Sequence, residues 1–163
     1  VQASLTGHLV LSTLHTNDAP SALTRLLDLG VPNYLIQSTL TGIVAQRLVR
    51  TLCQHCKVET SVDQRSWEAM THPWPLPLPE HSFGPKGCLE CRKTGFLGRT
   101  GIYEMLRISP ALRALIQPDM NLAKVGEVAL AEGMRPLRVS AANQVARGVT
   151  TLKEVMHVLP PIE

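Results

Sequence analysis

The residues of this chain best suited to chemistry are four cysteines arranged as two short pairs. Cys53 and Cys56 form one C-x-x-C pair, and Cys88 and Cys91 form the other, with residues 57–87 between them. Each pair can present two thiolates to one ion from a tight turn, and zinc prefers four such ligands in a tetrahedron. Four sulfurs leave no open position for water. The spacing therefore predicts a structural zinc site that ties the two ends of segment 57–87 together.

Two other interpretations of the cysteines remain open, namely redox-active pairs and free buried thiols. A thioredoxin-like site is expected to place one C-x-x-C pair in a β-α-β context, which the sequence lacks. No basic region precedes an apolar stretch at the start of the chain, so a secretory signal is not expected. In a reducing compartment, paired cysteines bind metal more often than they form structural disulfides. Zinc is therefore the favoured interpretation.

A second group of polar residues follows an apolar run near the start of the chain. Residues 8–14 are rich in leucine, follow a Thr-Gly pair, and are predicted to form a buried strand. His8 begins this segment, and His15 comes directly after it. Ligands of open α/β sheets bind at the carboxyl ends of the strands, so His15 is a candidate ligand-binding residue. The alternative is that both histidines make only structural hydrogen bonds, as isolated histidines commonly do.

Capping residues and glycines divide much of the remaining chain into elements. Asp18 before Pro20 predicts a helix that ends at Gly30, and Pro32 can begin a second helical segment whose apolar face continues to Leu52. Further capping signals predict four helices in the C-terminal part, which begin near Ser109, Asn121, Pro136 and either Thr150 or Thr151. These four helices are expected to form one small lobe.

The region between and after the cysteine pairs differs in character. Prolines alternate with other residues over 73–79, and proline is excluded from helix interiors and central strands. Segment 57–87 is therefore expected to be an extended excursion. Beyond the second pair, glycines within residues 95–101 predict a turn that leads into a short strand at residues 102–106.

Composition limits the classes of function. The chain has 163 residues, 44% of them hydrophobic and 18% charged, which is typical of a soluble globular protein. No apolar run approaches the roughly 20 residues that a membrane-spanning helix needs. The net charge of +3, with only two phenylalanines and two tyrosines, supplies neither the basic stripe nor the stacking platform of a nucleic-acid-binding module. No specific nucleic-acid partner is expected.

Several sequence motifs resemble those of one protein family. Residues 6–17, which read TGHLVLSTLHTN, resemble the histidine box of the secretion NTPase family that powers type II secretion and type IV pili. Both C-x-x-C pairs are similar to the tetracysteine zinc module of the family's assembly members. The similarity continues, in the family's order, through residues 25–30, 45–53, 98–104 and 150–155. The resemblance covers nearly the whole chain.

This resemblance implies an α/β fold. The chain corresponds to the C-terminal portion of a RecA-like P-loop NTPase domain without the P-loop, together with a four-cysteine zinc module and a small helical lobe. Three regions are expected. Residues 1–52 belong to the ATPase core with the histidine box, residues 53–106 form the zinc module with its proline-rich insertion, and residues 107–163 form the helical lobe.

The resemblance also implies a function for the full-length protein. Members of the family form homo-hexamers on the cytoplasmic face of the inner membrane and hydrolyse ATP with Mg²⁺. Their movements push on an inner-membrane platform protein within the secretion or pilus machinery. By the same resemblance, His15, with His8 in the same box, lies near the γ-phosphate and reports the nucleotide state.

One motif that ATP hydrolysis requires is missing from the sequence. No stretch of the form G-x-x-x-x-G-K-[ST] occurs, although phosphate binding needs such a loop. The chain also opens at Val1 without an initiator methionine, so we expect a fragment that does not hydrolyse ATP by itself. A free-standing zinc-binding module that binds nucleic acid or acts as an adaptor is the alternative. The motifs do not distinguish secretion from pilus assembly.

Overall fold

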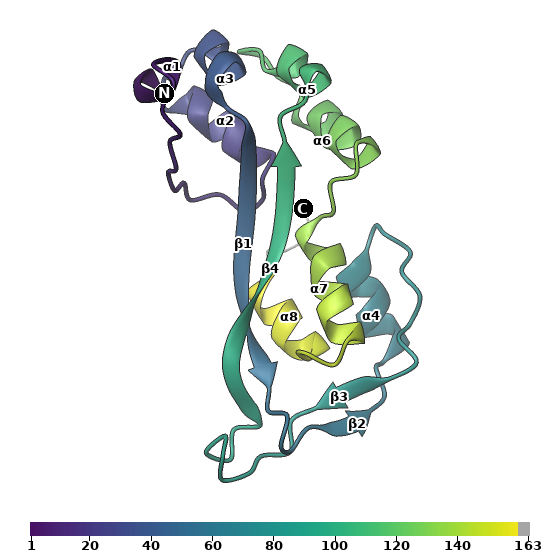
Figure 1. Cartoon of the computed structure of the whole chain (residues 1–163). Coiled ribbons are helices and arrows are strands. Elements are labelled where there is room, and N and C mark those ends of the chain that lie inside the picture. The colour runs from purple at the N-terminus through teal and green to yellow at the C-terminus, as the bar shows by residue number, and fades with distance from the viewer. Residues whose placement is uncertain (160–163) are drawn as a thin grey trace. The chain divides into compact units, whose positions relative to one another are not determined.

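The computed structural model describes residues 1–159, which form eight helices and four strands in two compact units. The first unit comprises Val1–Ala45 and Glu104–Arg135, and the second comprises Gln46–Tyr103 and residues 136–159. Helices of the first unit are α1 (Gln2–Leu5), α2 (Ser21–Asp28), α3 (Asn33–Thr39), α5 (Pro110–Leu115) and α6 (Leu122–Ala131). The second unit contains β2 (Val58–Thr60), α4 (Gln64–Thr71), β3 (Ser82–Gly84), α7 (Leu137–Ala146) and α8 (Leu152–Val158). The long strands β1 (Gly42–Leu52) and β4 (Phe96–Arg107) contribute residues to both units (Figure 1).

The helix boundaries follow the capping residues. The Asp18 carboxylate accepts the Ser21 N–H at 2.7 Å before α2, and Gly30 after this helix has a φ of +81°, which favours glycine. The side chains of Ser109 and Asn121 accept backbone N–H groups at the starts of α5 and α6. These helix predictions are confirmed, because each cap depends on residues only a few positions apart.

The helical continuation predicted up to Leu52 is wrong, because this segment is strand β1. Apolar residues at four-residue intervals suggested a helix, but two of them, Val44 and Leu48, are exposed. The inward face follows the two-residue period of a strand, with Ala45 and Val49 buried. β1 pairs with β4 in a two-stranded sheet. β4 itself begins at Phe96, so the predicted strand at 102–106 is correct in type but starts six residues earlier than expected.

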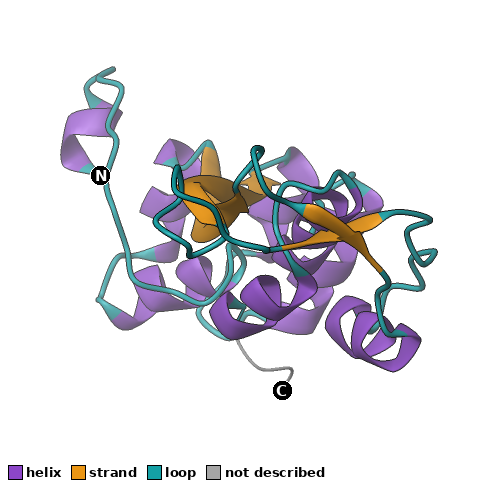
Figure 2. Ribbon diagram, turned by 90° about the horizontal axis from the view of Figure 1, so that it is seen from below, coloured by secondary structure: helices purple, strands orange, loops and turns teal. Residues whose placement is uncertain are grey.

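The prediction of a buried strand at residues 8–14 is not borne out in the described residues. This segment is a loop, drawn in teal between α1 and α2 in Figure 2. Leu9 and Leu11 are 86% and 88% exposed. A strand is stabilised by hydrogen bonds to a neighbouring strand, and within residues 1–159 no strand pairs with this segment.

The second unit has its own core. Trp67 and Met70 of α4 are buried, and α4 packs against α7 and α8. The expectation of a purely extended excursion at 57–87 is therefore wrong in part, because α4 forms before the alternating prolines begin. β2 and β3 then pair antiparallel, with Val58 opposite Gly84, and bring the two ends of the excursion together. The core side chains from the other elements include Val49, Leu52, Ile102, Leu137, Ala141, Ala142, Val145 and Val155.

All four helices predicted for the C-terminal part are present, but they belong to two compact units. α5 and α6 contact each other in the first unit, while α7 and α8 contact each other in the second. The division of the chain into regions 1–52, 53–106 and 107–163 stays a prediction, and residues 160–163 lie outside the described part of the chain.

Candidate metal centre

Two tight turns, each joining a long strand to a short one, carry the cysteines. Cys53 follows β1 and Cys56 precedes β2, in a turn where the N–H groups of Cys56 and Lys57 donate to the Cys53 carbonyl oxygen. Cys88 lies after β3 and Cys91 before β4, in a turn closed by the Lys93 N–H on the Cys88 carbonyl oxygen at 2.7 Å. Pairing of β2 with β3 places the turns side by side. The fold thus brings together cysteine pairs that are far apart in sequence.

The four sulfur atoms have the spacing of a single coordination shell. All Sγ atoms lie within 4.8 Å of one another. The distances are 3.9 Å from Cys53 to Cys88, and 3.8 Å both from Cys56 to Cys91 and from Cys88 to Cys91. A tetrahedral zinc site with Zn–S bonds of about 2.3 Å has S···S edges of about 3.8 Å. These separations are too long for a disulfide, whose S–S bond is about 2.05 Å. The geometry fits one tetrahedral ion.

The protonation of the sulfurs differs among the cysteines. The backbone N–H of Cys88, together with that of Gly95, donates to the Cys91 sulfur and lowers the pKa of Cys91 to about 6. Burial raises the pKa of Cys56 to about 12 and also raises the pKa of Cys53. The Cys91 sulfur is therefore stabilised as a thiolate, while Cys53 and Cys56 lose their protons more readily when a cation compensates the added charge. A divalent metal supplies that charge.

The second turn requires glycine at two positions, of which only Gly95 lies in the glycine-containing turn predicted from the sequence. Gly95 has a φ of +78°, and a Cβ atom on it would lie 2.2 Å from the Cβ of Pro85. A Cβ atom on Gly87, whose φ is +95°, would lie 2.6 Å from the Lys93 carbonyl oxygen. Neither position accepts a side chain, so the turn needs glycine on both sides of its cysteines. The G-x-x-G spacing after Cys91 indicated a turn. It did not indicate that Gly95 packs against Pro85, which lies ten residues earlier in the sequence.

The two histidines proposed from the resemblance lie in the first unit. His8 follows α1, and its Nδ1 atom lies 3.0 Å from the Thr6 hydroxyl. His15 is exposed at the end of the loop that precedes α2. The residues directly after it form an ordered turn, in which the Thr16 hydroxyl donates to the Asp18 carbonyl oxygen at 3.0 Å. The local arrangement thus fixes the chain beyond His15 more tightly than the segment before it.

Comparison with known proteins connects these features to one family. Residues 1–157 match the family described as "Type II/IV secretion system protein". The chain belongs to the type II/IV secretion system protein family. The predicted resemblance is thereby confirmed, since the match spans nearly all of the chain and includes the histidine segment and both cysteine pairs.

Relatives of this secretion family member come from both secretion and pilus systems. It is 50% identical over 160 residues to a protein of Acinetobacter baylyi named type IV pilus assembly ATPase TfpB, covering 98% of this chain and 27% of that protein. It is 45% identical over 158 residues to the type II secretion system protein HxcR of Pseudomonas aeruginosa, covering 97% and 30%. It is 44% identical over 164 residues to the type II secretion system ATPase E of Vibrio cholerae, covering 97% and 31%. The chain thus spans less than a third of the length of each of these relatives.

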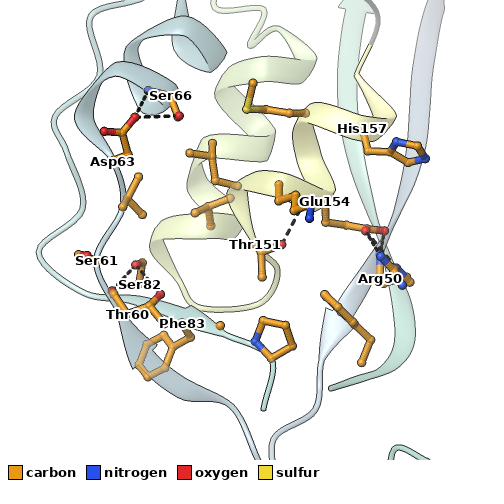
Figure 3. Close-up of a pocket in the computed structure, with 18 residues that line it drawn as sticks. Arg50, Thr60, Ser61, Asp63, Ser66, Ser82, Phe83, Thr151, Glu154 and His157 are labelled. Atoms are coloured by element: carbon orange, nitrogen blue, oxygen red, sulfur yellow. Dashed lines mark hydrogen bonds and ion pairs between the residues drawn. The ribbon is translucent and has the colours of Figure 1, made fainter. Parts of the chain in front are cut away.

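The second unit of this family member also contains a pocket of about 890 Å³ (Figure 3). One wall carries an ion pair that crosses from β1 to α8. Arg50 donates from Nε and Nη2 to the Glu154 carboxylate, with the shorter distance 2.6 Å, and its guanidinium lies 4.3 Å from the centre of the Phe96 ring. These hydrogen bonds lower the pKa of Glu154. The opposite wall is formed around Thr60, Ser82 and Phe83.

None of the helices among residues 1–159 has both the length and the apolar character needed to cross a membrane.

Proposed function

We propose that this chain is the C-terminal part of a hexameric ATPase that powers type II protein secretion or type IV pilus assembly. The observation that carries this proposal is the family match over residues 1–157, combined with relatives that are named ATPases of these two systems. In the full-length protein, ATP and Mg²⁺ are the substrate and cofactor. The proposed location is the cytoplasmic face of the inner membrane, where the hexamer acts on a platform protein of the machinery.

The ion of the cysteine cluster is proposed to be zinc. Its support is the sulfur geometry, with S···S distances of 3.8 to 3.9 Å that match a tetrahedral thiolate site. Because four protein sulfurs complete the shell, Cys53, Cys56, Cys88 and Cys91 would hold the ion in a structural role. The ion would join the ends of β1, β2, β3 and β4 at one point.

The histidine segment is proposed to be the tip of a RecA-like sheet in the full-length protein. Support comes from its apolar residues, since Leu9 and Leu11 are more than 80% exposed in this chain and the relatives are more than three times as long. A neighbouring strand from the remainder of the protein would bury them and satisfy the backbone of residues 8–14. His15 would then stand at the strand's carboxyl end, near the γ-phosphate of ATP, with His8 in the same box.

ATP turnover by the full-length protein tests this proposal. Wild-type protein, His15→Ala and the control His81→Ala are compared in a phosphate-release assay. His81 is an exposed residue of the second unit whose ring pairs with Glu59. We expect His15→Ala to reduce turnover at least tenfold and His81→Ala to change it less than twofold. Unchanged turnover in His15→Ala would return His15 to a structural role.

The fragment itself provides a second test. Because its sequence contains no G-x-x-x-x-G-K-[ST] loop, residues 1–163 alone are expected to show no ATP hydrolysis above a buffer control. In cells, removal of the full-length protein is expected to abolish either pilus extension or the release of a secreted substrate. Loss of neither would contradict the proposed function.

A further inference from the structure

A buried carboxylate of the first unit lies at the start of the helix that follows the histidine segment. Glu104 of β4 is only 5% exposed, and its Oε1 atom accepts the Ala19 N–H at 2.7 Å. Ala19 is fully buried and lies two residues before the first residue of α2. This contact joins positions 85 residues apart in sequence. A carboxylate is costly to bury unless it is hydrogen-bonded, so this contact is a specific feature of the fold.

The hydrogen bonds around Ala19 form one connected turn. The Asp18 carboxylate accepts the Ser21 N–H, and the Asp18 carbonyl oxygen accepts the hydroxyl of Thr16. Together with the contact of Glu104, these bonds fix the backbone from Thr16 to the first turn of α2. The Asp18 carboxylate accepts an N–H group of the first helical turn, and the Glu104 carboxylate lies just before this turn, near a helix end that favours negative charge.

His15 is the residue directly before this fixed turn. On its other side, residues 8–14 have no strand partner in the described chain. Within residues 1–159, the turn after His15 supports this residue from the C-terminal side, and Glu104 accepts one hydrogen bond of that turn from a distant part of the chain. Displacement of the Ala19 N–H would move the backbone to which His15 is attached.

We propose that Glu104 is a positioning residue for His15. Its carboxylate holds the Ala19 N–H and so sets where the His15 imidazole stands when nucleotide is bound. This inference rests on the proposed role of His15 in the full-length ATPase. Glu104 itself contacts neither substrate nor metal in this proposal, and its role depends on the location of one acceptor oxygen.

The location of the oxygen can be separated from its charge by two variants. Glu104→Gln keeps an oxygen acceptor at the same distance from the backbone but removes the charge. Glu104→Asp keeps the charge but withdraws the acceptor by one methylene. If position matters, the Gln variant retains turnover within about threefold of the wild type, while the Asp variant loses about tenfold in kcat. A role that depends on charge alone predicts the opposite order and would overturn the proposal.

The test uses the full-length protein, with steady-state ATP hydrolysis of wild type, Glu104→Asp, Glu104→Gln, His15→Ala and the double variant Glu104→Asp/His15→Ala. Exposed Glu127 supplies the control Glu127→Ala, which is expected to leave kcat unchanged. Glu104→Asp should lower kcat while the KM for ATP and the zinc content stay within twofold of wild type. The double variant should be no slower than His15→Ala alone, because both changes remove the same contribution.

The outcomes distinguish this inference from the proposed function. If His15→Ala is slow and Glu104→Asp lowers kcat by a further independent factor in that background, Glu104 acts elsewhere and the positioning role is wrong. If His15→Ala leaves kcat unchanged, the role proposed for His15 fails, and the inference fails with it. Hydrogen exchange of the peptide that contains residues 15–21 gives a readout without activity. Faster exchange in the Asp variant than in the Gln variant is expected, and equal exchange in both would contradict the proposal.

Discussion

The cysteine cluster and the histidine segment are the two candidate sites of this chain, but they differ in how far the described residues complete them. The four sulfurs have the spacing of a full coordination shell, built entirely from residues 53–91. The histidine segment exposes its leucines, and the turn that follows it is held by Asp18 and Glu104. A site made of tight turns forms within one compact unit. The histidine segment is a loop in this chain, and no strand among residues 1–159 pairs with it.

Removal of the metal is expected to cause the largest loss of stability. The loss should be confined to the unit that contains the cysteine cluster and should leave the histidine segment unchanged. Cys88→Ser, or chelation of the wild type, should release one zinc per chain and destabilise the second unit by about 4 kcal/mol or more. Zinc analysis and limited proteolysis measure this, with new cleavage expected within residues 53–103 and protection retained in residues 104–135. Leu89→Ala, an exposed neighbour in the same turn, is the control and should keep the metal. An unchanged cleavage pattern after chelation would mean that no metal holds this region.

A glycine of the second cysteine turn should have the next largest effect. Gly95→Ala introduces a Cβ atom 2.2 Å from that of Pro85 at a positive φ, and should cost about 2–4 kcal/mol in free energy of unfolding. Gly98→Ala is a matched control, because Gly98 has the same φ of +78° but open space around it. Only the backbone strain, about 1 kcal/mol, is expected there. Equal losses in urea denaturation of the two variants would show that packing against Pro85 does not matter.

The ion pair between Arg50 and Glu154 should make the second unit sensitive to acid. The hydrogen bonds from Arg50 lower the pKa of Glu154, so the pair contributes fully above the unfolded-state pKa near 4.5 and loses its contribution as pH falls below it. His157, which also faces Glu154, lowers this pKa further. Because the Arg50 side chain is 54% exposed, we expect a loss of only about 1 kcal/mol.

Thermal unfolding between pH 7 and pH 3 measures this contribution, and Glu154→Gln is expected to flatten the dependence. Glu127→Gln, which removes an exposed pair with Lys124, should leave the dependence as it is in the wild type. A Glu154→Gln profile parallel to that of the wild type would assign the acid sensitivity to other groups.

The smallest change in the free energy of unfolding of this chain is expected for a substitution in the histidine segment. The same substitution in the full-length protein tests whether a neighbouring strand buries this segment. Leu11→Ser should change the free energy of unfolding of residues 1–163 by less than about 0.5 kcal/mol, because Leu11 is 88% exposed. In the full-length protein the same change should cost about 2–5 kcal/mol if a neighbouring strand buries this residue. Leu23→Ala, at a fully buried position, should be costly in both proteins. Equal and small effects of Leu11→Ser in both would contradict the buried strand.

The parts of the fold that were predictable depend on short-range chemistry. The caps at Asp18, Ser109, Asn121 and Thr151 each satisfy backbone N–H groups within three residues, so their side chains indicate helix starts without any knowledge of packing. The cysteine pairs were recognised for the same reason, because each C-x-x-C turn is local. The strand β1 was not predicted, because the apolar residues Val44 and Leu48 on its exposed face are four residues apart, a spacing that is also typical of a helix.

The sequence by itself determined the helix starts in the C-terminal part, the two cysteine turns and the family resemblance. Only the tertiary structure decided which residues far apart in the chain meet. The Ala19 N–H lies against Glu104, and Arg50 pairs with Glu154. The physical reason is that a cap or a tight turn is selected by the chain next to it. A contact across 85 or 104 residues forms only when two strands and their helices have packed.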